Sequence, residues 1–244
     1  KQAFFMFSQK IKQKNKLFWC YDDPTLKTLK PVGCSYGEGE GADLRMTDFI
    51  SKEDGVYFSA TINGKTYSDI YVPLFGKHLA LNALAVYGMG HVLGIEHQAI
   101  LDSFKSFQGV ERRFEKRGHI NGVTIYDDYA HHPTEIKALF KTLKSLEKNK
   151  RIIALFQPHR YTRTSHLINE LASSFSEADI CFIADVYSAG ESPIKGASGK
   201  LLADKIALTQ DCTFFSKKTG LLDLKKILKD QDVVVTIGAG DIFN

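Results

Sequence analysis

The second half of the 244-residue chain alternates between two kinds of hydrophobic pattern. Short runs that are apolar throughout, such as IIALF, ICFIA and VVVTI, are typical of strands buried on both faces. The segments between them carry apolar residues every three or four positions, which indicates amphipathic helices. The predicted strands are 123–127, 151–157, 180–186, 212–216 and 233–238, and the predicted helices are 133–148, 165–176, 199–208 and 220–229.

Strands that alternate with helices in this way predict an α/β domain. Two strands that are joined by a helix run parallel, and this crossover is right-handed in almost all known proteins. The intervening helices then cover the sheet and keep its apolar strands away from water. We therefore expect the second half of the chain to form one mostly parallel sheet covered by helices.

The first half of the chain follows a different pattern. LFWCYD at 17–22 has the character of a short buried strand, and Asp23-Pro24 opens a short helical turn. VYFSATINGKTYSDIYV contains two strand-like runs joined by Asn63-Gly64, which predicts a β-hairpin with a two-residue turn. HLALNALAVYGMGHVL and HQAILDSFKSF are predicted to be helices. We place a domain boundary near Gly109, where this mixture gives way to the regular alternation.

Composition and charge narrow the class of protein. Hydrophobic residues make up 43% and charged residues 25%, which is ordinary for a globular protein. Lys and Arg number 32 against 28 Asp and Glu, giving a net charge of +4 and a pI of about 8.7. These basic residues are scattered, whereas a nucleic-acid binder usually carries a dense basic stripe, so we expect small anionic ligands instead. No apolar stretch of the sequence approaches the ~20 residues of a membrane span.

The cysteines indicate the cellular compartment, and the chain ends indicate whether the chain is part of a longer protein. Cys20, Cys34, Cys181 and Cys212 are far apart and form no C-x-x-C pair, which favours free thiols in a reducing, cytoplasmic compartment. The opening residues lack the apolar core of a signal peptide. The chain starts without Met, and VVVTIGAGDIFN stops just after a strand and a glycine turn. We therefore expect the chain to be part of a longer protein.

Polar residues gather where three of the predicted strands end. DDYAHHPTE follows the first strand of the second half, QPHRYTRT the second, and DVYSAGESPIKGASG the third. In open parallel sheets, ligands bind beyond the carboxyl ends of the strands. We therefore predict a binding site at this edge rather than three unrelated solvated loops.

The first of these loops could be a metal site, an acid/base site or only a polar loop. Asp127 and Asp128 alternate in direction at a strand end, so only one of them points easily into a shared cleft. His131 and His132 also diverge, and the loop holds no zinc-like ligand set. We expect histidines that hydrogen-bond or face a phosphate, with Pro133 starting a helix and His132 near its N-cap.

The second loop carries two arginines at the start of a predicted helix. Arg160 and Arg163 are three residues apart, a spacing that can put both guanidinium groups on one side of a helix. The positive amino terminus of the helix adds to their charge. We therefore predict a site for phosphate or carboxylate here, and the alternative is a pair of surface arginines.

Three glycine-rich stretches are poor candidates for phosphate-binding loops. YGEGEGAD at 36–43 carries two glutamates, and a β segment rather than a helix follows it. KGASGKLLA at 195–203 has Ile194 where a P-loop needs glycine and Leu201 where it needs Ser or Thr. GAGD at 238–241 follows a strand, but no helix follows it within the chain.

Taken together, these motifs resemble those of the Mur ligases of bacterial cell-wall synthesis. The resemblance rests on GKHLALNALA, FQGVERRFEKRG, YDDYAHHPTEI, FQPHRYTRT, DVYSAGESPI and TIGAGDI, which follow one another in family order and spacing over almost the whole chain. Within the family it is strongest to the members that add L-alanine to UDP-N-acetylmuramate. Members that recycle a tripeptide onto the same nucleotide sugar share the DD-aromatic-AHHPT element, but QPHRYTRT favours the alanine-adding members.

The resemblance implies the fold and the chemistry. Residues 1–109 would be the C-terminal part of a central, P-loop ATPase-type α/β domain with a β-hairpin region, and residues 110–244 a Rossmann-like C-terminal domain. ATP would phosphorylate the muramoyl carboxylate, and the amine of L-alanine would attack the acyl phosphate. The P-loop, the Mg²⁺ ligands and the UDP-sugar domain would lie upstream, so the chain alone is expected to be inactive.

The resemblance also implies residue roles. Asn82, Arg113 and Asp128 would lie on the nucleotide side, with Arg113 and Asp128 taking part in catalysis. No metal ligand is expected in this chain, and Leu79 replaces an asparagine common in the family. A different class, a noncatalytic module that binds anionic ligands, remains open. The residues expected on the muramoyl or alanine side are Tyr129, His131, His132, His159, Arg160 and Arg163.

Overall fold

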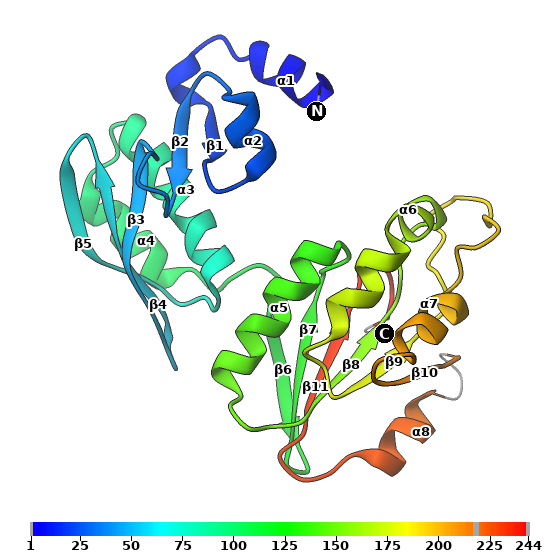
Figure 1. Cartoon of the computed structure of the whole chain (residues 1–244). Coiled ribbons are helices and arrows are strands. Elements are labelled where there is room, and N and C mark those ends of the chain that lie inside the picture. The colour runs from blue at the N-terminus through cyan, green and yellow to red at the C-terminus, as the bar shows by residue number, and fades with distance from the viewer. Residues whose placement is uncertain (1, 217–219, 243–244) are drawn as a thin grey trace. The chain divides into compact units, whose positions relative to one another are not determined.

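The computed structural model describes residues 2–216 and 220–242, which form two compact units with a division after Gly109. Each unit has its own sheet, and the two are described separately (Figure 1). The first unit contains helices α1 (Gln2–Gln9), α2 (Pro24–Leu29), α3 (Lys77–Val92) and α4 (His97–Ser106), the 3-10 turn η1 (Lys14–Lys16), and strands β1 (Phe18–Cys20), β2 (Cys34–Gly37), β3 (Leu44–Lys52), β4 (Gly55–Ile62) and β5 (Lys65–Val72).

The sheet of the first unit combines parallel and antiparallel pairs. Its strands follow the order β1-β2-β3-β4-β5; β2 pairs in parallel with β1 and β3, and the remaining pairs are antiparallel. Asn63 and Gly64, with φ of 51° and 73°, form the turn between β4 and β5, which confirms the predicted hairpin. Both predicted helices are present as α3 and α4, and they pack on the sheet around buried Phe58, Leu84 and Tyr87.

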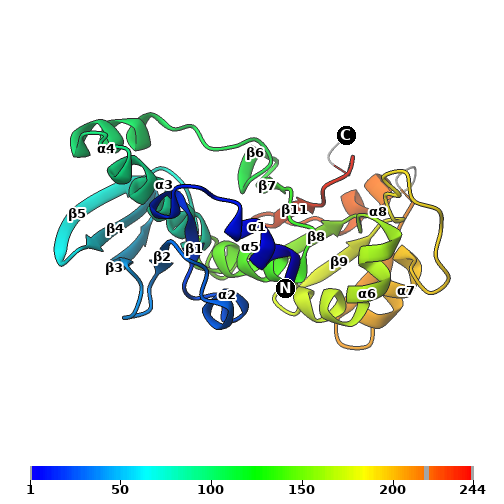
Figure 2. The ribbon, with the colours of Figure 1, turned by 90° about the horizontal axis from the view of Figure 1, so that it is seen from above.

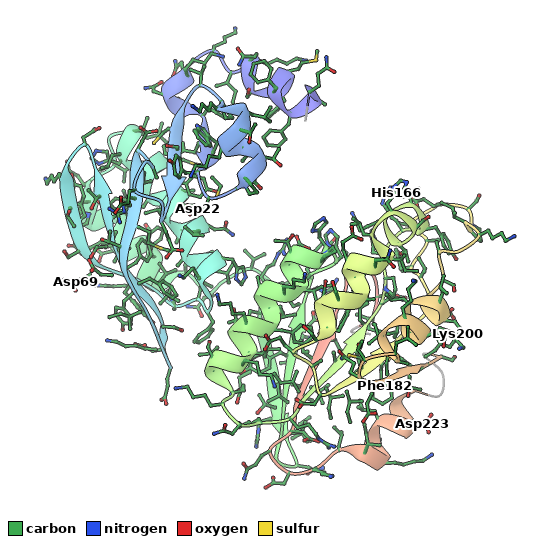
Figure 3. All side chains as sticks on the ribbon, viewed as in Figure 1. Asp22, Asp69, His166, Phe182, Lys200 and Asp223 are labelled. Carbon is green, nitrogen blue, oxygen red and sulfur yellow. The ribbon has the colours of Figure 1, made fainter. Side chains whose placement is uncertain are left out.

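The glycine-rich loop at 36–43 is closed by a carboxylate of the same unit. Asp22, labelled in Figure 3, accepts hydrogen bonds from the backbone N–H groups of Glu38 at 2.7 Å and Gly39 at 3.1 Å. A Cβ on Gly37 would come within 2.5 Å of the Asp22 carboxylate. These amides therefore hold a side chain of the protein itself, in agreement with the prediction that this loop is not a phosphate-binding loop.

The second unit is an α/β domain with a six-stranded sheet. Its strands follow the order β10-β9-β8-β11-β7-β6, and every pair is parallel except the pair of β6 with β7. Figure 2 shows the strands from β6 to β9 in this order. The elements are β6 (Glu115–Ile120), β7 (Val123–Asp128), α5 (Pro133–Leu146), β8 (Ile152–Phe156), α6 (Tyr161–Ala172), η2 (Ser173–Phe175), β9 (Ile180–Ile183), α7 (Gly199–Ile206), β10 (Asp211–Phe214), α8 (Gly220–Ile227) and β11 (Val233–Ile237).

The two faces of this sheet carry separate sets of buried side chains. Ile153 and Leu155 of β8 belong to a cluster that includes Leu224 of α8. Phe156, which points to the opposite face, contacts Phe175 with ring centroids 5.1 Å apart, and Phe175 contacts Phe140 of α5 at 5.7 Å. Helices therefore cover the sheet on both faces, and the predicted parallel, helix-covered sheet is confirmed.

Insertion of β11 between β7 and β8 positions the candidate site. The chain crosses the sheet in one direction from β7 to β10 and returns through α8 to β11. The carboxyl ends of β7, β11 and β8 consequently lie side by side. The loops that follow these three strands can therefore contact one another at one edge of the sheet.

Strand β6 is an antiparallel edge strand that the sequence pattern did not predict. Its residues, EKRGHI, are half-buried or exposed throughout. A strand at the edge of a sheet needs little apolar surface, so it leaves no hydrophobic pattern to detect.

Candidate functional site

Three loops meet at the carboxyl edge of the parallel sheet in the second unit. The rings of His131, after β7, and His159, after β8, have centroids 6.0 Å apart. His159 is stacked on Tyr187, after β9, with centroids 5.4 Å apart and an interplanar angle of 9°. The backbones of His159 and Tyr187 also pair as an isolated parallel bridge. The sequence pointed to these loops, although Tyr187 was not among its candidate residues.

The two adjacent aspartates point apart, as their alternation on a strand predicts. Asp127 is 1% exposed and accepts a hydrogen bond from Nε of Arg112 at 2.9 Å and another from the hydroxyl of Thr236. Asp128 is 6% exposed and accepts hydrogen bonds from the backbone N–H groups of Phe114 and Ala130, each at 2.7 Å. Burial raises the pKa of Asp128, and these two backbone hydrogen bonds oppose that effect.

Arg112 joins two of the loops, and the sequence did not single it out. Besides its ion pair with Asp127, its guanidinium donates to the carbonyl oxygen of Gly240 at 3.1 Å and to that of Gly238. It therefore fixes the loop after β11 to the end of β7. Its neighbour Arg113, the sequence candidate, is exposed.

Tyr129 lies between the arginines and the histidines. The guanidinium carbons of Arg112 and Arg113 lie 5.1 Å and 5.4 Å from the centre of its ring, within the range of a cation–π interaction. On another side, the ring of His131 meets it edge-on at 5.6 Å. The candidate residues after β7 and before β6 are thus connected through one aromatic ring.

The start of α5 is closed by the capping arrangement that the sequence predicts. His132 is the N-cap and Pro133 occupies the first turn. Nδ1 of His132 accepts from the backbone N–H of Thr134 at 3.3 Å. The carboxylate of Glu135 accepts from the backbone N–H groups of His131 at 2.9 Å and His132 at 3.1 Å. His132 is exposed, so only its Nε2 edge is available to a ligand.

The two arginines of the second loop have different partners. Nη1 of Arg163 donates to the carbonyl oxygen of His159 at 3.1 Å and lies 3.2 Å from Nδ1 of the same residue. Arg160 is the N-cap of α6 with φ of 72°, and its guanidinium lies 3.4 Å from the carboxylate of Glu191. Arg163 therefore orients a histidine of the site, whereas Arg160 is tied to the loop after β9.

Glu191 occupies the amino terminus of α6, where the sequence predicts a site for phosphate or carboxylate. Its carboxylate accepts hydrogen bonds from the backbone N–H of Thr162 at 3.0 Å and from its hydroxyl at 2.7 Å. The backbone hydrogen bond from Thr162 is the largest of the effects that lower the pKa of Glu191. An anionic ligand at this helix end would have to displace a carboxylate of the protein itself.

The loop after β11 packs tightly against the other two. The side-chain oxygen of Gln157 accepts from the backbone N–H of Asp241 at 3.1 Å. A Cβ on Gly240 would lie 2.5 Å from that oxygen and 2.8 Å from the ring of Tyr187. A larger residue at this close approach would force the Gln157 or Tyr187 side chain to shift, which accounts for the second glycine in TIGAGDI.

The sequence candidate Asn82 belongs to the first unit, and the described residues offer no metal site. Asn82 is an exposed residue of α3 in the first unit. Within the part of the chain that the structure describes, no three His, Cys, Asp or Glu side chains gather closely enough to hold a metal ion.

Among residues 2–216 and 220–242, no helix combines the length and the apolar character that crossing a bilayer requires.

The environment of His159 predicts a pH effect. Burial lowers its pKa below the ordinary value, and the positive charges of Arg163, His131 and Arg160 lower it further, against an opposing contribution from Glu191. Below about pH 6.5 the unfolded chain therefore binds a proton that the folded chain resists, and stability should fall as the pH falls. We expect an NMR titration to place the pKa of His159 below that of a free histidine.

Replacement of Arg163 tests the cause of this shift. Arg163→Met should move the titration of His159 part of the way back towards the ordinary value, because burial remains. Arg117→Met, which removes an exposed arginine of β6, serves as the matched control and should leave it unchanged. Equal titrations of His159 in the unsubstituted chain and in Arg163→Met would refute this account.

Comparisons with known proteins agree with this architecture. The family described as Mur ligase, glutamate ligase domain matches residues 112–240. UDP-N-acetylmuramate–L-alanine ligase of Protochlamydia amoebophila is 38% identical over 243 residues, covering 99% of this chain and 54% of that protein. The ligase of the same name from Brachyspira hyodysenteriae is 40% identical over 248 residues, covering 98% and 54%. The chain thus spans about half the length of the curated relatives it matches.

Solved structures of ligases also match this chain. The crystal structure of the UDP-N-acetylmuramate–alanine ligase of Thermotoga maritima matches with a TM-score of 0.76 and 27% identity, covering 99% of this chain and 51% of that one. A murein peptide ligase of Psychrobacter arcticus matches with a TM-score of 0.70 and 19% identity, covering 98% and 51%. The second likeness shows a shared fold only.

Proposed function

Since this chain belongs to the Mur ligase, glutamate ligase domain family, we propose that it is part of an ATP-dependent ligase that joins L-alanine to UDP-N-acetylmuramate in peptidoglycan biosynthesis. The observation that supports this reaction best is the edge of the sheet where Arg163, His159 and His131 gather. Cationic and N–H donor groups on a helix-covered sheet suit a substrate that carries phosphate and carboxylate.

We further propose which domain of the ligase each unit represents. Residues 1–109 would belong to the central, ATP-binding domain of the ligase and residues 110–244 would be its C-terminal domain. The match of the family to residues 112–240 supports the second assignment. The four cysteines are free, which supports a reducing, cytoplasmic setting for the protein.

The proposed reaction has two steps. The γ-phosphoryl group of ATP is transferred to the muramoyl carboxylate, which gives an acyl phosphate and ADP. The amine of L-alanine then attacks the acyl carbon, and phosphate leaves as the amide forms. Both steps build up negative charge on oxygen, so positioned arginines and N–H donors contribute more than covalent catalysis.

The structure supports a division of roles among the candidates. Arg113, exposed beside Tyr129, can extend towards a nucleotide phosphate, and Asp128 holds the turn that carries it through the backbone of Phe114. Asn82 is proposed to contact the nucleotide from α3. The proposed residues on the muramoyl or alanine side are Tyr129, His131, His132, His159, Arg160 and Arg163.

Magnesium ligands are not among the roles proposed for this chain. The described residues offer no group of three suitable ligands, so they do not fit a magnesium site. The Mg²⁺ ligands are expected in the part of the protein that the relatives have in addition.

Product formation by the longer protein tests the proposal. Phosphate release is expected only when ATP, UDP-N-acetylmuramate and L-alanine are present together, and the 244-residue chain alone should not turn over. Release that depends on the tripeptide instead of alanine would identify a recycling ligase. Binding of UDP-N-acetylmuramate without phosphate release under any combination would identify a noncatalytic module.

A further inference from the structure

His159 has only one neutral tautomer that fits its surroundings. Its Nδ1 lies 3.2 Å from Nη1 of Arg163. A guanidinium group can only donate hydrogen bonds, so Nδ1 must accept and cannot carry a hydrogen. The ring proton of neutral His159 therefore resides on Nε2, and this edge of the ring is a hydrogen-bond donor.

His131 has the opposite constraint. Its Nδ1 lies 3.0 Å from the carbonyl oxygen of Tyr129 and 3.6 Å from a carboxylate oxygen of Glu135. Both oxygens can only accept, so Nδ1 of His131 must carry the hydrogen. The Nε2 edge of neutral His131 is left with a lone pair, which can accept a hydrogen bond or a proton.

We propose that His131 and His159 form a pair of opposite tautomers, in which Nε2 of His131 takes a proton from the attacking amine and Nε2–H of His159 binds an anionic substrate oxygen. This assignment rests on the proposed function for its substrates, but the tautomers themselves follow from the contacts within this chain. The centroids of the two rings lie 6.0 Å apart, a separation that one substrate molecule can span.

The surroundings keep each ring in its orientation. His159 is stacked on Tyr187 and faces Arg163, with Arg160 and Glu191 nearby. His131 meets the edge of Tyr129, and the carboxylate of Glu135 lies on its Nδ1 side. A carboxylate in that position stabilises the imidazolium that His131 becomes when it takes up a proton.

His131 takes up its proton after the amine of L-alanine has attacked the acyl phosphate. The lone pair of the neutral amine forms the C–N bond, and the π electrons of the acyl carbonyl move onto its oxygen. The nitrogen, now positive, gives one proton to Nε2 of His131. The carbonyl re-forms as the C–O bond to phosphate breaks, and phosphate leaves with that electron pair. His131 then returns its proton to solvent.

NMR spectroscopy of the 244-residue chain tests the tautomers directly. With ¹⁵N-labelled histidine at about pH 8, above the ordinary histidine pKa of about 6.5, long-range ¹H–¹⁵N correlations distinguish the two ring nitrogens. We expect a protonated Nε2 in His159 and a protonated Nδ1 in His131. Variants His131→Asn and His159→Gln assign the signals. The same tautomer in both residues, or the reverse assignment, would overturn the inference.

A pair of arginine variants tests what fixes the tautomer. Arg163→Met should mix the two tautomers of His159, because its Nδ1 loses the donor that faces it. Arg160→Met removes a neighbouring guanidinium that contacts Glu191 instead, and it should leave the tautomer unchanged. A tautomer of His159 that is fixed in both variants would contradict the role given to Arg163.

Kinetics of the longer protein test the proton transfer. His131→Asn keeps an N–H donor for the carbonyl of Tyr129 but has no ring nitrogen to accept a proton. It should lower kcat with alanine by about 10²-fold and remove the acidic limb of the kcat–pH profile that reports this histidine. Exchange of label between ADP and ATP with UDP-N-acetylmuramate, which reports acyl phosphate formation, should persist.

Variants of His159 and His166 test which substrate oxygen His159 binds and provide the control. His159→Phe keeps a ring that can stack on Tyr187 but has no N–H donor at the Nε2 position; an increased KM for alanine would place the bound oxygen on the amino acid, and a slower exchange would place it on the acyl phosphate. His166→Asn, on the exposed side of α6 (Figure 3), is the matched control and should behave as the unsubstituted enzyme. A normal kcat in His131→Asn would refute the proton transfer. Absence of any alanine-dependent turnover, with the expected tautomers present, would refute the proposed function alone.

Discussion

Replacement of Asp127 by alanine is expected to lower the free energy of unfolding of the second unit by about 3–5 kcal/mol, the usual effect of breaking a buried ion pair. Asp127 is 1% exposed, and the side chain of its partner Arg112 is 15% exposed. Without the carboxylate, the half-buried guanidinium of Arg112 and the hydroxyl of Thr236 each lose an acceptor. Urea denaturation measures the loss of free energy. Hydrogen exchange of the amides in β7 and β11 shows whether the loss affects these strands.

An exposed ion pair of the same unit provides the control. Asp223, on α8 (Figure 3), pairs with Lys226, and their side chains are 59% and 73% exposed. Asp223→Ala should change stability by less than about 1 kcal/mol, because water screens such pairs. If Asp127→Ala and Asp223→Ala destabilised the unit equally, the Arg112–Asp127 pair could not be what fixes the loop after β11 to the end of β7.

The same variant should also disturb the site. Arg112 donates to carbonyl oxygens in the loop after β11 and lies over the ring of Tyr129. Release of Arg112 from Asp127 therefore loosens the connection between the β7 and β11 loops. The stability of this part of the fold and the geometry of the candidate site thus depend on one guanidinium group.

The sequence predicted most of the parallel sheet because its strands are buried on both faces. IIALF and VVVTI became β8 and β11, and Asn63-Gly64 formed the turn of its hairpin. The divergence of Asp127 and Asp128 also followed from strand geometry alone. Local patterns succeed where the structure depends on the period of the backbone and on burial.

The features that were missed depend on contacts between distant residues or on weak local patterns. Helix α6 begins at Tyr161, earlier than predicted, because its first turn is polar and is capped by Glu191 from the next loop. The ion pair of Arg112 with Asp127 likewise joins separate segments. No local pattern distinguishes Arg112, which is half-buried and structural, from Arg113, which is exposed.

Arg163→Met in the longer protein is expected to reduce kcat/KM for the proposed alanine-adding reaction by about 10²–10³-fold, as is typical when one donor to a developing oxyanion is removed. Arg163 contributes a positive charge, and its hydrogen bonds fix the backbone and ring of His159. Methionine retains much of the aliphatic length but neither the charge nor the donors. Steady-state phosphate release with all three substrates measures the effect.

The fold should survive this change, because both hydrogen bonds of Arg163 are made within the start of α6 and the residues just before it. Thermal unfolding of Arg163→Met should therefore resemble that of Arg117→Met, in which an exposed arginine of β6 is replaced in the same way and activity should be retained. A collapsed thermal transition in Arg163→Met alone would assign the residue a structural role. Normal kinetics in both variants would show that the arginine does not face the reacting groups, since a donor that contacts a developing charge cannot be removed without slowing the reaction.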